Sequence, residues 1–351
     1  MSVARPDLSV IVASYETRES SLACLAALAR ARSAHPELVS ETIVVDNGSR
    51  DGSVEAIAAV GGGVRLLALA RNRGFAAAIN LGLRVARGRH VLLLNSDASI
   101  EPDVLARGVG LLDESTDVGV LGVALLHPDG RPQRSAHPLP GLATELLPEA
   151  WLRLLRPCAV ASASPGRPAA VDGGRLVEVE AVRGAVFFVR GELLEKLGPL
   201  DESYFFFLEE TDYCRRVRAA GYRVGLCTDL RAIHGLGISS KRRSPLATRI
   251  EYHRSLYRYL SRQSGKAVAL LAAALRTLRT LAVLPGLAVA ACFSLRSKAR
   301  LAERAGLALW HLRGCPREPD FATAIAASVS RGRASVDVGE LAQAFETGEE
   351  G

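Results

Sequence analysis

Residues 42–49 are Thr42-Ile43-Val44-Val45-Asp46-Asn47-Gly48-Ser49, a short apolar run that ends in polar residues. The run of β-branched residues is typical of a strand that is buried on both faces of a sheet. The Asp-Asn-Gly-Ser sequence after it is typical of a turn. Because such a strand needs helices on each side of its sheet, this segment favours an α/β fold.

The neighbouring segments continue this alternation of strand and helix. The predicted strands lie at residues 8–15, 42–49, 64–69 and 90–95, and the predicted helices lie between them at residues 18–32, 54–60 and 75–86. This spacing indicates βαβ units and a mostly parallel sheet. Ligands of such sheets bind beyond the carboxyl ends of the strands. Asp46 and Asp97 both lie just past a predicted strand, so they are candidate ligand-binding residues.

The second half of the chain is predicted to be less regular and then helical. Residues 125–178 are rich in Pro, Gly and Ala and include an expected flexible stretch at residues 162–174. The further expected elements are a strand at 177–189, a helix at 191–197, a strand at 222–227, and helices from 249 onward to a mobile acidic tail. We therefore expect an α/β domain over residues 1–250 and a helical, basic region over residues 251–351.

Length and composition are those of a globular protein. The 351 residues are 48% hydrophobic and 23% charged, which suits one large domain with an appendage. The six cysteines lack Cys-X-X-Cys spacing, which argues against a zinc site or a disulfide framework and favours a reducing compartment. The apolar run at residues 8–13 is too short for a signal peptide, so a cytoplasmic protein is expected.

The positive charge of the chain is concentrated in its last third. Between Lys241 and Arg313 there are fifteen Lys and Arg against two Glu, a local balance of +13 within a net charge of +7. Two apolar stretches lie in this region, at residues 267–275 and 281–295. Each is shorter than the roughly 20 residues that a membrane-spanning helix needs, and Pro285 interrupts the second.

Apolar helices bordered by cations fit the surface of an anionic membrane. We therefore expect peripheral attachment to the inner face of the plasma membrane. The alternative is a soluble helical cap that packs against the rest of the chain or against a second subunit in a homodimer. Nucleic acid is not expected as a partner, because aromatic residues are not interleaved with the basic ones and no recognition motif is present.

A cluster of carboxylates follows an aromatic run in the second half of the chain. Tyr204 to Leu208 is apolar, and Glu209, Glu210 and Asp212 come directly after it, followed by paired arginines. Carboxylates near an apolar wall are costly unless a cation, a metal or a proton compensates them. The cluster is therefore a candidate catalytic site. The alternative is a helix N-terminus, where acidic side chains interact favourably with the helix dipole.

A second candidate site is Asn95-Ser96-Asp97, at the end of the predicted strand 90–95. A carboxylate at this position can bind a hard divalent cation that also contacts phosphate oxygens. One Asp is too few for tight binding, so the metal is expected to be shared with a phosphate-bearing ligand. A dinucleotide site is disfavoured, because no Gly-X-Gly-X-X-Gly sequence follows the first strand.

The ordered set of motifs resembles glycosyltransferase family 2, and within it the rhamnosyltransferase-like branch. The set comprises residues 44–53, 71–75 with Asn80, 94–97, 183–185, 200–202 and 209–212. The resemblance implies a GT-A fold, a Rossmann-like and mostly parallel sheet that binds a nucleoside-diphosphate sugar together with Mg²⁺ or Mn²⁺. It also implies an inverting reaction, in which an acceptor hydroxyl attacks the anomeric carbon of the sugar in one displacement.

The resemblance also implies roles for individual residues. The catalytic base is expected to be Glu210, which stands where the family's commoner Glu-Asp pattern has Asp, with Glu209 as the alternative. The metal ligands are expected to be Asp97 and His234, while Asn95 replaces the first acid of the family's Asp-X-Asp motif. The expected nucleotide-sugar contacts are Ser14, Tyr15, Asp46 (to the base), Asn47, Arg71, Asn72, Gly74, Asn80, Asn95, Ser96, Arg183 and Gly184.

The implied function is transfer of a sugar to a glycan or lipid-linked acceptor in the synthesis of cell-surface polysaccharide or glycolipid. Rhamnose from dTDP-rhamnose is the donor that fits the resemblance best. One alternative is a nucleotidyltransferase, although the Gly- and Lys-bearing loop that it needs after the first strand is missing. Another is a protein that keeps the fold but only binds sugar nucleotides or serves as a membrane scaffold.

Overall fold

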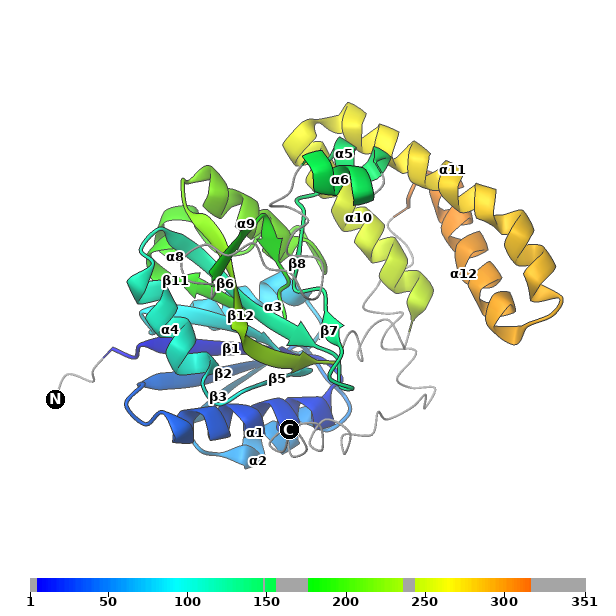
Figure 1. Ribbon diagram of the computed structural model, residues 1–351. Coiled ribbons are helices and arrows are strands. Elements are labelled where there is room, and N and C mark those ends of the chain that lie inside the picture. Colours follow the sequence, from blue (N-terminus) through cyan, green and yellow to red (C-terminus); the bar gives the residue numbers. More distant parts are fainter. Residues whose placement is uncertain (1–4, 148, 156–175, 236–243, 317–351) are drawn as a thin grey trace.

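The computed structural model describes residues 5–147, 149–155, 176–235 and 244–316 (Figure 1). The first part of the chain forms β1 (Leu8–Ser14), α1 (Arg18–Ala34), β2 (Ser40–Asp46), α2 (Ser53–Val60), β3 (Val64–Ala68), α3 (Phe75–Leu83), β4 (His90–Asn95), β5 (Ala98–Ile100) and α4 (Val104–Glu114). The predicted strands and helices up to residue 95 are therefore confirmed. The expected flexible stretch 162–174 and the acidic tail lie outside the described residues.

The middle of the chain adds further strands and short helices. These are β6 (Val118–Leu126), β7 (Pro132–Gln133), β8 (Ala136–His137), α5 (Leu142–Leu146), α6 (Glu149–Leu155), β9 (Leu176–Val179), β10 (Ala181–Val182), β11 (Val186–Arg190), α8 (Gly191–Leu197), α9 (Glu209–Ala219) and β12 (Arg223–His234). The C-terminal helices are α10 (Pro245–Ser264), α11 (Lys266–Ala291) and α12 (Leu295–Leu312). The division of the chain at residue 250 stays a prediction, and α10 runs through it.

The main sheet is mixed, with a parallel half at its N-terminal side. Its strand order is β3-β2-β1-β4-β11-β6-β12-β5, with β7 paired to β6 and β9 paired to β12. Strands β3, β2, β1 and β4 are parallel, whereas β11 runs antiparallel to both β4 and β6. Strands β8 and β10 form a separate antiparallel pair. The sheet is thus the α/β sheet that the sequence predicts, extended by antiparallel strands.

The core lies in two layers, one on each face of this sheet. Val10 and Val12 of β1 pack into the layer that contains Leu25 and Leu28 of α1. Ile11 of the same strand points the other way, into the layer that contains Ile79 of α3. Both faces of the strand are therefore covered, which explains why its sequence is continuously apolar rather than alternating.

The strand character predicted over residues 177–189 is confirmed, in the form of three short strands, β9, β10 and β11, because the chain leaves the main sheet at β10 to pair with β8. One prediction about regular elements is wrong. The apolar stretch 267–275 and most of the stretch 281–295 form one helix, α11, which continues through Pro285. A proline removes one backbone hydrogen bond, but the bonds on either side hold the helix together.

Helix α11 is longer than either of the apolar stretches that the sequence analysis considered too short to span a membrane. By length and composition it is the one helix of the described residues that could cross a membrane, with a mean hydropathy of 1.8 and only 17% of the apolar window buried. The core helix of a soluble protein would meet the same test but would be mostly buried. In Figure 1, α11 and α12 lie side by side and project away from the sheet, with α5 and α6 beside the first part of α11.

Candidate active site

The parallel strands bring the predicted binding motifs to one edge of the sheet. Ser14 of β1 pairs in register with Asp46 of β2, and Ala13 pairs with Asn95 of β4. All three strands run in the same direction, so Ser14, Asp46 and Asn95 mark adjacent carboxyl ends. Ligands of open α/β sheets bind at this edge.

Asp46 is buried and fully engaged in the turn that follows it. One oxygen of its carboxylate accepts hydrogen bonds from the backbone N–H groups of Gly48 and Ser49, at 3.1 and 2.8 Å, and the other accepts one from the Ser49 hydroxyl at 2.6 Å. Gly48 has a φ of +85°, and a Cβ there would lie 2.6 Å from the Cα of Arg71. Only glycine therefore fits where the two loops meet.

The loop that contains Asn72 and Gly74 connects this edge to the carboxylate segment. The side-chain amide of Asn47 donates hydrogen bonds to Asn72 Oδ1, at 2.9 Å, and to the carbonyl of Gly74, at 3.0 Å. The N–H of Phe75 then donates to the carbonyl of Phe205, at 2.8 Å. The loop after β3 and the segment that precedes α9 are therefore held together, although they are far apart in the chain.

Several other predicted contacts are engaged with the protein itself. The hydroxyls of Ser14 and Ser96 lie 3.3 and 3.0 Å from that of Thr17 in a buried cluster. The amide of Asn80 is bonded to both backbone groups of Leu200, at 2.8 and 3.0 Å. Asn80 thus holds the loop before α9 in place, and its contact with a nucleotide sugar stays a prediction. Tyr15 packs beside Phe205 and Phe206.

His234 and Asp97, the predicted metal ligands, are buried and adjacent. Nε2 of His234 lies 3.4 Å from Asp97 Oδ1 and 3.4 Å from Asn95 Nδ2. Gln133 on β7 contacts the histidine on the side away from Asp97. Its Nε2 donates to the His234 carbonyl at 3.1 Å, and its Oε1 lies 2.8 Å from His234 Nδ1. Since Oε1 can only accept, Nδ1 carries a proton, and Nε2 is the ring nitrogen that faces Asp97.

Asp97 and His234 are suitable ligands for a divalent cation, but two protein ligands are too few to hold one tightly. Carboxylate and neutral imidazole both bind Mn²⁺-like ions, and a hydrogen bond to the far nitrogen is the usual support for a ligating histidine. Across the described residues, no group of three or more His, Cys, Asp or Glu side chains is arranged to hold a metal. A cation here would need ligands from a bound phosphate, as the single Asp predicts. Sequence patterns did not identify Gln133, which is paired with His234 only by the fold.

The carboxylate cluster lies at the start of α9, after a strained piece of backbone. Phe207 and Leu208 have φ angles of 72° and 68°, a conformation that bulky residues rarely adopt, and α9 begins at Glu209. Such strain costs about 1–3 kcal/mol per residue and concentrates at functional sites. The helix N-terminus that the sequence left as an alternative is therefore real, and it presents the acidic residues in its first turn.

Glu209 and Glu210 face different surroundings. The side chain of Glu209 is buried, at 4% exposed, whereas Glu210 lines a cavity of about 860 Å³. Burial and the neighbouring charge of Glu210 raise the pKa of Glu209 well above its usual range. Burial also raises the pKa of Glu210, but hydrogen bonds at the helix start and the charge of Arg183 oppose the rise. Of the two, only Glu210 can meet a molecule in the cavity.

Arg183 and Gly184 lie between the sheet edge and Glu210. The N–H of Asn95 donates to the carbonyl of Ala185 at 3.0 Å, which places this loop beside the end of β4. A Cβ on Gly184 would lie 3.3 Å from Cγ of Glu210. Burial lowers the pKa of the Arg183 guanidinium and the negative charge of Glu210 raises it, so the two side chains are close enough to interact electrostatically. The cavity lining includes Arg183 and Glu210 but not Asp46, Asp97 or His234.

Comparison with known proteins identifies the family. Residues 9–182 match the model of glycosyl transferase family 2. This chain belongs to glycosyltransferase family 2. It is 23% identical, over 67% of its length and 69% of the relative's, to the low-salt glycan biosynthesis hexosyltransferase Agl10 of Haloferax volcanii. It is 26% identical, over 64% of its length and 75% of the relative's, to an N-acetylglucosaminyl-diphospho-decaprenol L-rhamnosyltransferase of Mycobacterium tuberculosis.

The fold of this family 2 glycosyltransferase also matches that of a solved relative. The mannosyltransferase PcManGT from Pyrobaculum calidifontis, in complex with GDP-Man and Mn²⁺, aligns with a TM-score of 0.54 at 22% identity, over 93% of this chain and 87% of that chain. The GT-A fold expected from the sequence is therefore confirmed. Family membership also makes the chain a sugar-transferring enzyme, which argues against the non-catalytic alternative.

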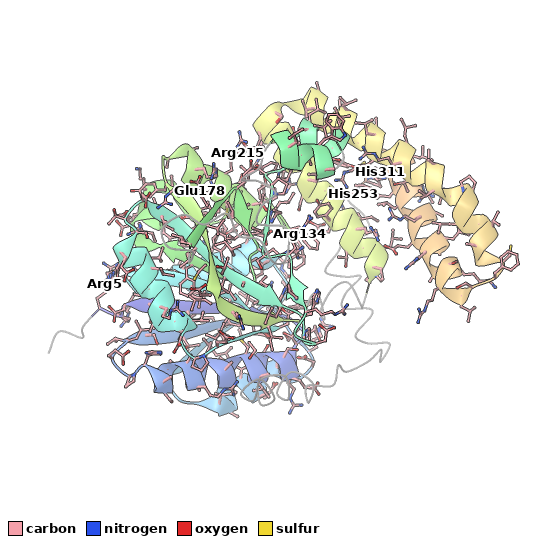
Figure 2. The ribbon with its side chains drawn as sticks, in the orientation of Figure 1. Arg5, Arg134, Glu178, Arg215, His253 and His311 are labelled. Carbon is pink, nitrogen blue, oxygen red and sulfur yellow. The ribbon has the colours of Figure 1, made fainter. Side chains whose placement is uncertain are left out.

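In this glycosyltransferase, three separate parts of the chain enclose the cavity beside Glu210. The transferase domain supplies Glu210, Arg183 and the segment around Arg134 and His137, and α5 with α6 supplies a second wall. The third wall comes from the C-terminal helices, with Thr248, Arg249, Tyr252, His253, Arg276 and Glu303. Figure 2 shows Arg134 and His253 on the parts of the domain and of α10 that face one another. The C-terminal helices thus form part of the candidate site.

Asp212 does not line the cavity and is bonded to Arg216 and Gln263 instead. Its carboxylate accepts a hydrogen bond from Nε of Arg216 at 3.1 Å, one turn along α9. Its other oxygen lies 3.3 Å from the side-chain nitrogen of Gln263 on α10. Of the paired arginines that follow the carboxylate cluster, Arg216 is therefore the one that is paired with Asp212.

Proposed function

We propose that this chain is an inverting glycosyltransferase in which Glu210 is the catalytic base. The observation that carries the proposal is that Glu210 combines three properties: it lines a large cavity, it lies at the ligand-binding edge of a GT-A sheet, and its pKa is raised. A base with a raised pKa accepts a proton more readily near neutral pH.

The reaction follows from this geometry. An acceptor hydroxyl in the cavity attacks the anomeric carbon of the donor sugar while Glu210 takes its proton. A glycosidic C–O bond forms, the C–O bond to the diphosphate breaks, and the nucleoside diphosphate leaves with the electron pair. The hydroxyl and the leaving group lie on opposite faces of the sugar ring, so the configuration of the carbon inverts.

The donor would bind along the sheet edge, with Asp46 near the nucleotide base and Asp97 near the diphosphate. A divalent cation, Mg²⁺ or Mn²⁺, would be held by Asp97 and His234 together with phosphate oxygens, and it would neutralise charge on the leaving diphosphate. The support on the protein side is the Gln133 contact, which turns Nε2 of His234 toward Asp97. Gln133 and His234 would thus act as a unit.

For the substrates, we propose dTDP-rhamnose as donor and a glycan or lipid-linked acceptor. The sequence motifs of the rhamnosyltransferase-like branch support this choice, as does the similarity to a rhamnosyltransferase whose name gives a lipid-linked acceptor. The enzyme would then act in the synthesis of cell-surface polysaccharide or glycolipid. We also propose that it is cytoplasmic and attached to the inner face of the plasma membrane through α11 and α12.

A donor panel tests this function. The full-length protein would be incubated with dTDP-rhamnose and other sugar nucleotides, with Mn²⁺ or Mg²⁺, and nucleoside-diphosphate release would be measured. Glu210→Gln should lower the release by a factor of about 10² to 10⁴, the usual contribution of a general base. Glu209→Gln is the matched control, because its side chain does not line the cavity, and it should retain most of the activity.

Other outcomes would contradict the proposal in different ways. Release of pyrophosphate instead of nucleoside diphosphate would indicate nucleotidyl transfer. Full activity of Glu210→Gln, together with loss of activity in Glu209→Gln, would show that Glu209 is the base instead. Binding of sugar nucleotide without any turnover would leave only a binding function.

A further inference from the structure

A histidine on β8 contacts the helical turn that carries Glu210. Nε2 of His137 lies 3.0 Å from the hydroxyl of Thr211, which follows Glu210 in the first turn of α9. His137 and Glu210 both line the cavity, whereas the side chain of Thr211 is fully buried. A buried hydroxyl is therefore in contact with one side chain of the cavity wall and adjacent to another, the proposed base.

The hydroxyl of Thr211 is also hydrogen-bonded to the carboxylate of Glu210. Burial raises the pKa of Glu210, whereas its own backbone N–H, the charge of Arg183, and the backbone N–H and hydroxyl of Thr211 lower it. Hydrogen bonds donated to a carboxylate stabilise its charged form. Thr211 therefore helps to keep the base ionised, and so able to take a proton, in surroundings that favour the neutral acid.

The single proton of the Thr211 hydroxyl fixes the direction of both hydrogen bonds. A carboxylate can only accept, so Thr211 donates to Glu210. The hydroxyl oxygen must then accept from His137, which places the proton of the neutral ring on Nε2. With a donor at this position, the hydroxyl proton of Thr211 is directed to the carboxylate.

His137 is suited to this role because its ring stays neutral. Burial, together with the charges of Arg183 and Arg134, lowers its pKa to about 4. Above about pH 5 the ring therefore carries one proton and does not titrate together with the base. Strand β8 fixes the position of the ring through its pairing with β10, which directly precedes Arg183.

We infer that His137 and Thr211 are positioning residues for the catalytic base: Nε2–H of His137 donates to the Thr211 hydroxyl, and this hydroxyl donates to the carboxylate of Glu210. This inference rests on the proposed function, because it takes Glu210 as the base. The two hydrogen bonds would hold the carboxylate in one orientation and oppose the effect of burial on it. Sequence patterns assigned a role to neither residue, because they lie 74 residues apart and meet only in the fold.

Other titratable and charged groups also face this series of hydrogen bonds. They are Glu209 and Cys214 on α9, Arg183 before β11, Tyr252 on α10, and Arg134 beside His137. Variants that change only His137 or Thr211 leave all of these groups in place. A change in the pKa of Glu210 in such variants therefore reports on the two hydrogen bonds.

Nuclear magnetic resonance of the full-length protein, without any substrate, tests these bonds directly. With isotope-labelled histidine, the ring of His137 should be neutral and carry its proton on Nε2 between pH 6 and pH 8. With isotope-labelled glutamate, the carboxyl signal that is missing in Glu210→Gln gives the pKa of Glu210. Thr211→Val and His137→Leu should each raise this pKa by about half a unit to one unit, the effect of one lost hydrogen bond.

Three further variants control the titration. His137→Gln keeps a side-chain N–H donor, so the pKa of Glu210 should stay close to that of wild type. Thr248→Val removes another buried hydroxyl of the cavity wall, which donates to the carbonyl of Ser244 at 2.8 Å, and should not change this pKa. His137→Leu/Thr211→Val should show the same pKa as Thr211→Val alone, because both changes act through one hydrogen bond.

The pH dependence of nucleoside-diphosphate release from dTDP-rhamnose provides a second readout. The acidic limb of kcat/KM reports the pKa of the base in the free enzyme. It should move to higher pH in Thr211→Val and His137→Leu, by the shift that the carboxyl signal shows. A merely structural role of these residues would lower the rate equally at every pH.

Two results would overturn the inference. One is a neutral His137 with its proton on Nδ1, because Thr211 would then donate to the histidine and not to Glu210. The other is a Thr211→Val variant in which the pKa of Glu210 is that of wild type. Full activity of Glu210→Gln, with the magnetic resonance results as expected, would count against the proposed base and not against the hydrogen bonds.

Discussion

At the scale of single residues, the structure distinguishes side chains that are neighbours in the sequence. Successive residues on a helix point about 100° apart, so Glu209 and Glu210 at the start of α9 face different directions. Glu209 is buried, whereas Glu210 lines the cavity. The raised pKa of both carboxyls follows from the same apolar surroundings.

The contact between Gln133 and His234 leads to a prediction about metal dependence. Gln133→Ala removes the acceptor that orients the ring through His234 Nδ1, so Nε2 would no longer be held toward Asp97. Loss of such a supporting contact typically weakens metal binding 10–100-fold. The Mn²⁺ concentration for half-maximal nucleoside-diphosphate release should rise by about that factor, with little change at saturating Mn²⁺.

A control is Gln263→Ala, which removes a half-buried glutamine whose contact is with Asp212. It should leave the Mn²⁺ requirement unchanged. If the two variants behave alike, or if Gln133→Ala lowers the rate equally at every Mn²⁺ concentration, Gln133 does not act through a metal ligand.

At the scale of elements, a chain of polar side chains ties the C-terminal helices together. Arg276 of α11 donates to Nε2 of His253 at 3.3 Å, and Nδ1 of His253 lies 3.1 Å from Nε2 of His311 on α12. Nδ1 of His311 lies 2.9 Å from the carbonyl of Leu307. Figure 2 shows the two histidines on facing helices. Because Arg276 can only donate, both rings are uncharged with the proton on Nδ1, and each donates to the next acceptor.

These hydrogen bonds between Arg276, His253 and His311 predict that the protein is less stable at acidic pH. Burial and Arg276 lower the pKa of His253 from 6.5 to about 2, so below pH 6.5 the unfolded chain binds a proton that the folded protein does not. The free energy of unfolding of wild type should therefore fall as the pH drops below about 6.5. His253→Gln can make the same two hydrogen bonds without titrating, so it should lose less stability over that range, as measured by denaturant unfolding at pH 7 and pH 5.

His35 provides a control of opposite sign. It is bonded to Asp103 and Glu37 at 2.9 Å each, and these partners raise its pKa. Its contribution to stability is present at low pH and is lost as the pH rises through the raised pKa. His35→Gln should therefore lower stability more at pH 5 than at pH 7. Equal pH slopes for wild type and His253→Gln would show that His253 is not held neutral.

At the scale of the whole molecule, the outer surface of α11 and α12 is the most apolar exposed part of the described chain. Leu270, Leu278 and Val289 of α11 are each more than 60% exposed. Phe293, between α11 and α12, is 86% exposed, and Leu295, the first residue of α12, is 81% exposed. Arg296, Lys298 and Arg300 follow directly. Exposed apolar side chains beside cations match the interface of an anionic bilayer. We therefore expect membrane contact here.

Vesicle binding tests this expectation. The protein should sediment with vesicles that contain phosphatidylglycerol and much less with pure phosphatidylcholine, since each cation near the surface contributes about 1 kcal/mol. The double variant Phe293→Glu/Leu295→Glu should reduce this binding by at least about tenfold and leave nucleoside-diphosphate release in solution unchanged. Val39→Glu, which alters an exposed apolar residue before β2, should bind vesicles like wild type.

The competing arrangement is a homodimer that covers the same surface. Light scattering would then give a dimer for wild type and a monomer for Phe293→Glu/Leu295→Glu, with no vesicle binding by either protein. That result would contradict membrane contact.

The sequence by itself determined the α/β architecture, the family and the motifs of the sheet edge. Alternating strands and helices are encoded by local apolar patterns, and parallel strands bring their carboxyl ends together whatever the details of packing. Asp46, Asn95 and Asp97 could be assigned to one edge for that reason. The split of residues 177–189 into three strands could not, because it depends on the pairing of β10 with β8.

Only the tertiary structure decided the features that join distant parts of the chain. Gln133 meets His234 across 101 residues, and Glu145 meets Arg276 across 131. The continuous helix α11 and the cavity that the C-terminal helices help to enclose are likewise decided by the tertiary structure. Such contacts leave no local pattern, because they arise from packing between elements whose sequences carry information only about their own buried faces.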